Sequence, residues 1–252
     1  MLQCQTIAAN EKGFPMRAFP TSLTLMLALL CAAPPALARD NLYGAARRSA
    51  DGIGKTYMGR EIAQVMGYPG ADWLERGSRE REERPDLLLA ALALTPGMVV
   101  ADVGAGTGYY SWQIAGRIGD AGRVYAVDVQ PQMIELLTDR MRKRGVRNVQ
   151  SVLGTATDTG LAPGSIDLAL MVDVYHELDH PREIVDSILR ALRPDGRLAL
   201  VEYRAEDDSV PIKRLHKMSV AQIRHELGAQ GLQWQQTVDT LPWQHIVIFR
   251  KP

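Results

Sequence analysis

At the centre of the sequence stands Ala101-Asp102-Val103-Gly104-Ala105-Gly106-Thr107-Gly108, between the apolar run 98–103 and the amphipathic segment 109–118. Glycines at a strand-to-helix turn let the backbone approach a ligand, and the start of a helix offers free N–H groups. The dinucleotide fingerprint G-x-G-x-x-G would require glycine at position 109, where this chain has Tyr109. The tighter glycine spacing therefore predicts a ligand-binding turn and disfavours a nicotinamide-dependent oxidoreductase.

On both sides of this turn, apolar runs alternate with amphipathic segments. We expect strands at 98–103, 124–129, 149–153, 166–174 and 197–203, and helices at 109–118, 132–144 and 182–192. Continuous apolar strands that alternate with helices indicate a parallel sheet covered on both faces. After a helix at 219–228, two β-type runs at 232–238 and 245–250 are joined by a short connection, so they must be antiparallel.

An acidic residue ends the second expected strand. Asp128 lies twenty residues after Gly108. A carboxylate at this place can accept hydrogen bonds from both ribose hydroxyls of an adenosine ligand.

These residues give the segment 97–204 a resemblance to a known family. It resembles the class I (Rossmann-like) S-adenosylmethionine-dependent methyltransferases, nearest the ubiquinone/menaquinone-type small-molecule methyltransferases. The turn Arg193-Pro194-Asp195-Gly196-Arg197-Leu198 is similar to the family's turn before the fifth strand, with Asp195 where the family has glycine. The resemblance implies an α/β fold: a seven-stranded, mostly parallel Rossmann-like sheet with an antiparallel last strand, helices on both faces and an N-terminal helical lid. The implied cofactor is S-adenosyl-L-methionine.

The resemblance also implies which residues bind the cofactor. The methionine end would be lined by Asp102, Gly104, Ala105, Gly106 and Gly108, the ribose held by Asp128 and Val129, and the adenine placed near Thr155 and Ala156. The family often has aspartate at the adenine position, and here either Thr155 or Asp158 could replace it.

The end of the fourth expected strand supplies the catalytic candidates. Because carboxyl ends of parallel strands form the ligand crevice, Asp173, Tyr175, His176 and Glu177 should face the transferred methyl group or the sulfonium. Asp173 is counted with the cofactor site; His176, Glu177 and Tyr175 are the candidate catalytic residues, with His176 as general base or substrate partner. Val174 and Tyr175 replace the prolines of an N-P-P-Y motif, which disfavours methylation of adenine or glutamine amino groups.

Several other polar residues have a less specific interpretation than the glycine turn and Asp128. His176 and His180 flank Glu177 with a spacing similar to a helical zinc site, but Pro181 follows directly, so we expect no metal ligand. Glu202, Tyr203, His216 and Lys217 are expected near the same crevice. The charged run 78–84 is interpreted first as a solvated helix face and second as a substrate or cofactor clamp. A lid function for Tyr57, Met58 and Arg60 is a hypothesis.

The first part of the chain has a different composition. Residues 1–38 match an export signal: Met16-Arg17, an apolar run at 23–33, and the exit Ala36-Leu37-Ala38, with Met16 as an alternative start. Its apolar run is too short for an ordinary membrane span. We expect residues 39–93 to form a lead-in, irregular to 59 and helical from 60, and residues 94–252 to form the methyltransferase domain. The location is then exported, in the periplasm, or cytoplasmic if the leader does not function.

Composition limits the partners. The 252 residues are 46% hydrophobic and 23% charged with a formal net charge of zero, so nothing points to nucleic acid or an anionic membrane. Signal cleavage would remove Cys4 and Cys31, which argues against the cysteine-dependent arsenic methylation of some relatives. We therefore expect methyl transfer to a small organic acceptor. An exported, non-catalytic protein on the same fold stays open, because S-adenosylmethionine is made in the cytosol.

Overall fold

A computed structural model describes residues 42–252. The predicted export signal at 1–38 lies outside the described residues. Within residues 42–252, none of the helices has the length and apolar character that crossing a membrane requires.

The central sheet has the strand order β10-β11-β8-β7-β4-β5-β6, and the short strand β9 pairs with β8. Its strands are β4 (Val99–Val103), β5 (Arg123–Asp128), β6 (Val149–Leu153), β7 (Ile166–Val172), β8 (Leu192–Arg204), β9 (Lys217–Met218), β10 (Gln233–Val238) and β11 (Gln244–Arg250). The α-helices are α1 (Arg79–Glu83), α2 (Pro85–Ala91), α3 (Ser111–Ile118), α4 (Pro131–Lys143), α5 (Pro181–Ala191) and α6 (Val220–Gly228). The 3-10 helices of the described residues are η2 (Tyr68–Glu75), η3 (Tyr175–Glu177) and η4 (Arg214–His216).

The sheet confirms the expected topology. β4, β5, β6, β7 and β8 pair in parallel, whereas β11 is antiparallel to both β8 and β10. The chain runs outward from β4 through β5 to β6, and then returns to the other side of β4 with β7. This reversal of direction between β4 and β7 is the point at which open α/β sheets bind ligands.

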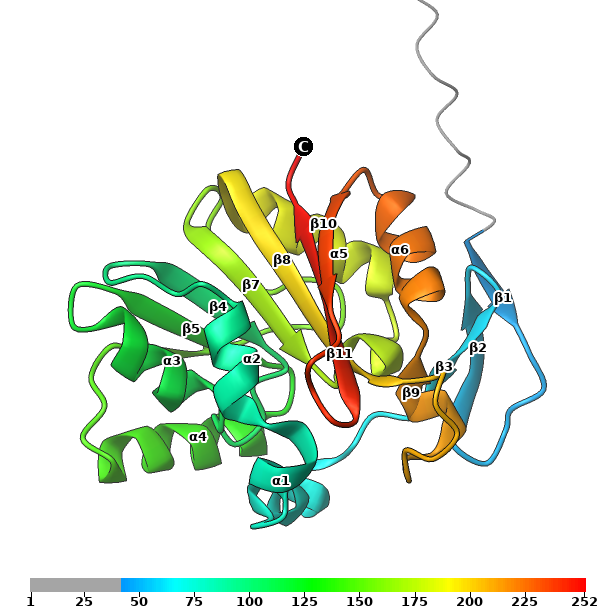
Figure 1. The fold of residues 1–252 in the computed structure, drawn as a ribbon, viewed down its shortest axis with the longest axis horizontal. Coiled ribbons are helices and arrows are strands. Elements are labelled where there is room, and N and C mark those ends of the chain that lie inside the picture. The colour runs from blue at the N-terminus through cyan, green and yellow to red at the C-terminus, as the bar shows by residue number, and fades with distance from the viewer. Residues whose placement is uncertain (1–41) are drawn as a thin grey trace, which may run out of the picture. The chain divides into compact units, whose positions relative to one another are not determined.

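Helices cover both faces of the sheet (Figure 1). Along β7, Ala169 and Met171 pack in the cluster that includes α5 and α6, whereas Leu168 and Leu170 pack in the cluster that includes α2 and α3. All four side chains are fully buried. Because neighbouring residues of a strand point to opposite faces, burial on both faces explains the continuous apolar run in the sequence.

The segment before η2 contradicts the expectation of an irregular lead-in followed by a helix from residue 60. Strands β1 (Tyr43–Ala45), β2 (Gly52–Tyr57) and β3 (Arg60–Ala63) form a separate antiparallel sheet. Tyr57 pairs with Arg60 across a two-residue turn in which Met58 and Gly59 both have positive φ, at 48° and 87°. Such turns usually carry asparagine or aspartate before the glycine, so Met58 hid the hairpin from sequence reasoning. The helical part of the predicted lid begins only at η2.

Candidate active site

A cavity of about 970 Å³ opens at the carboxyl ends of β4, β5 and β7, where the strand order reverses. Its floor includes the glycine turn after β4, the end of β5 and the residues that follow β7. Residues of β2, β3 and η2 line its N-terminal side, and the stretch 211–216 before β9 lines another. Its size lies within the range of small-molecule and cofactor sites.

Two glycines of the turn line the cavity, as the resemblance implies. Gly104 has φ +74°, and a Cβ there would overlap the side chain of Val174. Gly106 has φ +53°, and a Cβ there would lie 2.6 Å from Cδ1 of Leu74 in η2. Only glycine tolerates both the positive φ and the close approach, so the backbone itself forms this wall.

Three other implied cofactor residues do not line the cavity. The buried carboxylate of Asp102 accepts a hydrogen bond from Oγ of Ser111 at 2.6 Å. Ala105 packs with the cluster of Leu137 and Met141, and a Cβ on Gly108 would lie 2.9 Å from Cε of Met141. Asp102 is thus attached to α3, whereas Ala105 and Gly108 pack against α4, so these positions support the turn from the side away from the cavity.

Asp128 lies at the cavity with its carboxylate held in place. Its Oδ2 accepts from the N–H of Gly106 and its Oδ1 from the N–H of Gln130, each at 2.9 Å. Burial raises the pKa of Asp128 above its ordinary value, against the effect of these hydrogen bonds. Each carboxylate oxygen has a second lone pair, so both can still accept from a ligand.

The residues expected near adenine also line the cavity: Val129, Thr155, Ala156 and Asp158. The hydroxyl of Thr155 accepts from the N–H of Asp158 at 3.0 Å within its own turn. The carboxylate of Asp158 binds Gly160, Ser187 and Arg190. Both side chains that the sequence left as alternatives are thus engaged by neighbouring groups.

Asp173 follows β7 and lines the cavity with φ +55°. Its Oδ2 accepts from Nε2 of Gln244 at 2.8 Å, whereas its Oδ1 is buried without a hydrogen-bond partner among the described residues. Burial, followed by the nearby carboxylates of Glu83 and Glu202, raises the pKa of Asp173 well above its ordinary value. An unpartnered buried oxygen of this kind is suited to a ligand that donates a hydrogen bond or carries positive charge.

The charged run 78–84 is a solvated helix face only in part: Glu80, Arg81 and Arg84 are exposed, but two other members are buried. Arg79 and Glu83 are 4% and 1% exposed, line the cavity, and form an ion pair at 2.7 Å in α1. Arg76 binds the other oxygen of Glu83 at 2.5 Å, and the hydroxyl of Tyr203 donates to it at 2.9 Å. The spacing of four between Arg79 and Glu83 was the only signal in the sequence.

At the other end of the cavity, His176 is fixed from behind. Its Nδ1 lies 2.6 Å from Oε2 of Glu202, which is fully buried. Its Nε2 lies 3.2 Å from Nδ1 of His216, and Glu177 adjoins it in η3. His176, Glu177 and His216 all line the cavity. His216 and Glu202 had been expected near the crevice, but no sequence signal indicated that they would contact His176.

The protonation of this group follows from its surroundings. Burial opposes a charged imidazole, but the Glu202 carboxylate outweighs burial and raises the pKa of His176. Burial and the neighbouring His176 lower the pKa of His216 to about 4. Burial raises the pKa of Glu177 to about 7. The two facing imidazoles, those of His176 and His216, are therefore protonated once more readily than twice.

Tyr175 does not reach the cavity, contrary to its place among the catalytic candidates. Its side chain is fully buried in the cluster under α5 and α6, and its hydroxyl has no hydrogen-bond partner in the described chain. Its backbone N–H donates to Oε1 of Glu202 at 2.9 Å. Tyr175 therefore helps to hold Glu202, which holds His176.

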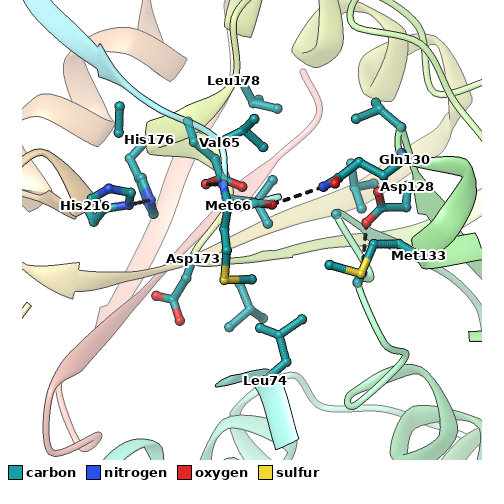
Figure 2. Close-up of a pocket in the computed structure, with 18 of the residues that line it drawn as sticks. Val65, Met66, Leu74, Asp128, Gln130, Met133, Asp173, His176, Leu178 and His216 are labelled. Atoms are coloured by element: carbon teal, nitrogen blue, oxygen red, sulfur yellow. Dashed lines mark hydrogen bonds between the residues drawn. The ribbon is translucent and has the colours of Figure 1, made fainter. Parts of the chain in front are cut away.

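The segment between β3 and η2 crosses the cavity. Figure 2 shows Met66 between the His176–His216 pair on one side and Asp128 on the other. The N–H of Met66 donates to Oε2 of Glu177 at 3.0 Å, and its carbonyl accepts from Nε2 of Gln130 at 3.1 Å. This segment, rather than Tyr57, Met58 and Arg60, covers the site. Arg60 instead binds the carbonyl of His176 at 2.9 Å and the buried carboxylate of Glu226.

Sequence comparison finds a family match in the central part of the chain. Residues 101–200 match the family model described as a methyltransferase domain. Over 111 residues the chain is 31% identical to an arsenite methyltransferase of Halobacterium salinarum, which covers 44% of this chain and 28% of that protein. Over 109 residues it is 30% identical to a ubiquinone/menaquinone biosynthesis C-methyltransferase of Ectopseudomonas mendocina, covering 43% of each protein. The matched segment thus spans less than half the length of these curated relatives.

Solved structures share the fold over a longer range. A SAM-dependent methyltransferase from Aquifex aeolicus superposes with a TM-score of 0.71 at 24% identity, covering 75% of this chain and all of that one. A putative methyltransferase of Haloferax volcanii, solved with its Trm112 activator, gives a TM-score of 0.59 at 16% identity, over 73% of this chain and 97% of that chain. At these identities the likeness establishes the architecture alone.

Proposed function

Because the chain carries a class I methyltransferase domain, a family whose cofactor is S-adenosylmethionine, we propose that it methylates a small organic acceptor. One observation carries this proposal. A single cavity has the glycine turn and Asp128 at one end, and His176, Glu177 and His216 at the other. One end suits an adenosine-bearing cofactor, and the other offers polar groups that can orient a nucleophile.

The residues present fit this cofactor. In the proposal, the walls at Gly104 and Gly106 admit the methionine part and Asp128 accepts from the ribose hydroxyls. The unpartnered Oδ1 of Asp173 supports binding of a cationic ligand, since S-adenosylmethionine carries both an ammonium and a sulfonium group. Val129 and Ala156 offer surface for the adenine ring.

Catalysis in this proposal depends mainly on positioning. When bound, the cofactor supplies a sulfonium methyl group that a nucleophile can displace in line. The chain would hold the acceptor at the His176 end, with Glu202 fixing the imidazole ring from behind. Val65, Met66 and Trp73 would restrict water over the site. Holding two reactants in attack geometry is worth about 7–11 kcal/mol of the barrier in favourable cases.

The segments that enclose the cavity favour a small acceptor. Residues from β2 to η2 and from the stretch 211–216 line it on two sides, which leaves little room for a folded protein or a duplex. Residues 42–252 contain no cysteine, so this part of the chain lacks the thiolates that arsenic methylation would need.

The test is acceptor-dependent release of S-adenosylhomocysteine by the purified full chain. We would offer S-adenosylmethionine with panels of small hydroxyl, thiol and amine compounds, and separately with protein and nucleic acid. We expect turnover with one small-molecule class. His176→Ala should abolish that turnover while leaving cofactor binding intact. Turnover only with a macromolecule, or none with a protein that binds the cofactor, would contradict the proposal.

We further propose that the protein acts after export. The support is the sequence pattern at 1–38 alone, and an exported enzyme needs its cofactor delivered from the cytosol. Cell fractionation with a C-terminal epitope tag tests the idea. A shortened chain in the exported fraction would agree with it, and a wholly cytosolic, full-length chain would contradict it.

A further inference from the structure

We propose that His176, His216 and Glu177 bind one divalent transition-metal ion, with zinc as the best match, at the acceptor end of the cavity. This inference deepens the proposed function, because the ion would hold the acceptor. The sequence led us to expect no metal, because the candidate pair was His176 and His180, and Pro181 follows His180 directly in a segment that starts at a strand end. The fold instead brings His216 to His176 across forty residues of chain.

The distances suit a shared ion. Nε2 of His176 and Nδ1 of His216 face each other at 3.2 Å. Two nitrogens that bind one tetrahedral zinc ion at 2.0–2.1 Å are separated by about 3.3 Å. One ligand atom from each of His176, His216 and Glu177 lies within 4.8 Å of the others. A small rotation of the Glu177 side chain would complete the set.

The balance of charge also indicates a cation. In the described part of the chain, no lysine or arginine lies within ion-pair distance of Glu177 or Glu202. Arg60, which donates to the carbonyl of His176, is paired with Glu226. Glu202 is paired with His176, whereas the partly buried carboxylate of Glu177 has no cation of its own, and a divalent ion bound between Glu177 and the two imidazoles would supply that charge.

The surroundings match those of a metal site that binds substrate. Glu202 contacts Nδ1 of His176 and leaves Nε2 for a ligand, the outer arrangement usual for a histidine that binds metal. The N–H of Met66 orients the carboxylate of Glu177. Three protein ligands leave a coordination position open, as in catalytic rather than structural zinc sites.

The open position indicates the acceptor class. All three ligands line the cavity, so an acceptor could reach the ion directly. A hydroxyl that coordinates the ion releases its proton to solvent and is held as an oxyanion, because the ion lowers its pKa. We therefore infer a hydroxyl-bearing small molecule as the acceptor.

The experiment measures metal binding by the full chain without cofactor. Equilibrium dialysis against Zn²⁺ gives stoichiometry and affinity, and the visible spectrum of bound Co²⁺ reports nitrogen ligands and coordination number. The variants are His216→Ala and Glu177→Gln. His180→Ala is the matched control, since His180 belongs to the sequence pattern but does not line the cavity.

We expect one equivalent of metal in the wild type and in His180→Ala. His216→Ala should lose more than the roughly 10–100-fold in affinity that removal of an outer partner costs. Unchanged binding by His216→Ala, equal loss in His180→Ala, or no binding by the wild type would overturn the proposal. Binding of S-adenosylmethionine by each variant, measured in parallel, shows that it is folded. It also separates failure of the metal site from failure of the proposed function.

Discussion

Burial governs the acidic side chains beneath and around the cavity. Asp102 and Glu202 are almost or wholly inaccessible to water, and Asp173 keeps one buried oxygen without a partner. In the described chain Glu202 pairs with His176, whereas Asp102 and Asp173 form no ion pair. Asp102 has the simplest surroundings, because its one side-chain hydrogen bond comes from Ser111. Such groups cost folding free energy when they are charged, unless a partner or ligand compensates them.

Asp102 allows a test of that cost. Burial raises the pKa of Asp102 from 3.8 to about 6. A carboxyl whose pKa is higher in the folded state contributes its full stability below the unfolded pKa, and this contribution is lost as pH rises toward the folded value. The loss amounts to about 3 kcal/mol, from about 1.4 kcal/mol for each pKa unit.

Asp102→Asn removes this titration but keeps an acceptor for Ser111. We expect the variant to exceed the wild type in free energy of unfolding at about pH 8, and the difference to shrink toward about pH 4. Urea unfolding of both proteins at several pH values measures it. A difference that does not depend on pH would refute the account of Asp102.

At the scale of elements, the N-terminal hairpin and the segment that crosses the cavity are attached by a small number of polar contacts. Arg60 of β3 joins Glu226 of α6 and the carbonyl of His176 in η3. Farther along, Gln130 accepts from the N–H of Tyr68 at 2.8 Å and donates to the carbonyl of Met66. These contacts connect the N-terminal hairpin and the segment between β3 and η2 to both ends of the cavity.

Loss of Arg60 should destabilise the fold strongly. Arg60→Met leaves the fully buried carboxylate of Glu226 without its cation, which costs about 3–5 kcal/mol for a buried pair. Removing both charges with Arg60→Met and Glu226→Leu should restore much of this. Denaturant unfolding measures the effect. Arg84→Met, which breaks an exposed pair with Asp86, should change the free energy of unfolding far less than Arg60→Met does. A similar loss in both single variants would contradict the argument.

Gln130 should stabilise the segment between β3 and η2 in its position over the cavity. Gln130→Ala removes both side-chain hydrogen bonds to the segment, so we expect amide exchange of Tyr68 to accelerate by about fivefold per kcal/mol of hydrogen bond lost. Hydrogen exchange read by mass spectrometry or NMR measures it. Gln113→Ala, which removes a side-chain bond from α3 to the carbonyl of Tyr109 just before the helix, is the control. Equal amide exchange at Tyr68 in the wild type, Gln130→Ala and Gln113→Ala would show that packing alone holds the segment between β3 and η2 over the cavity.

At the scale of the molecule, the sequence predicted what depends on local pattern. The glycine turn, Asp128 and the strand expected at 166–174, which the structure ends at Val172, follow from periodicity and from residues at strand ends, and the sheet order confirmed the fold they imply. The hairpin at Met58 was missed because its turn lacks the usual residues. The approach of His216 to His176 depends on where a long connection lies, which periodicity does not encode.

The central claim is that the cavity binds S-adenosylmethionine through Asp128. Calorimetric titration of the purified protein with S-adenosylmethionine, S-adenosylhomocysteine and NAD tests it most directly, with Asp139→Ala on the outer side of α4 as a control for Asp128→Ala. We predict micromolar binding of the first two ligands and none of NAD. Asp128→Ala should weaken binding about 10–100-fold, as expected for lost hydrogen bonds to a charged group, while Asp139→Ala binds as the wild type does. A folded protein that binds none of the three ligands, or that prefers NAD, would contradict the account.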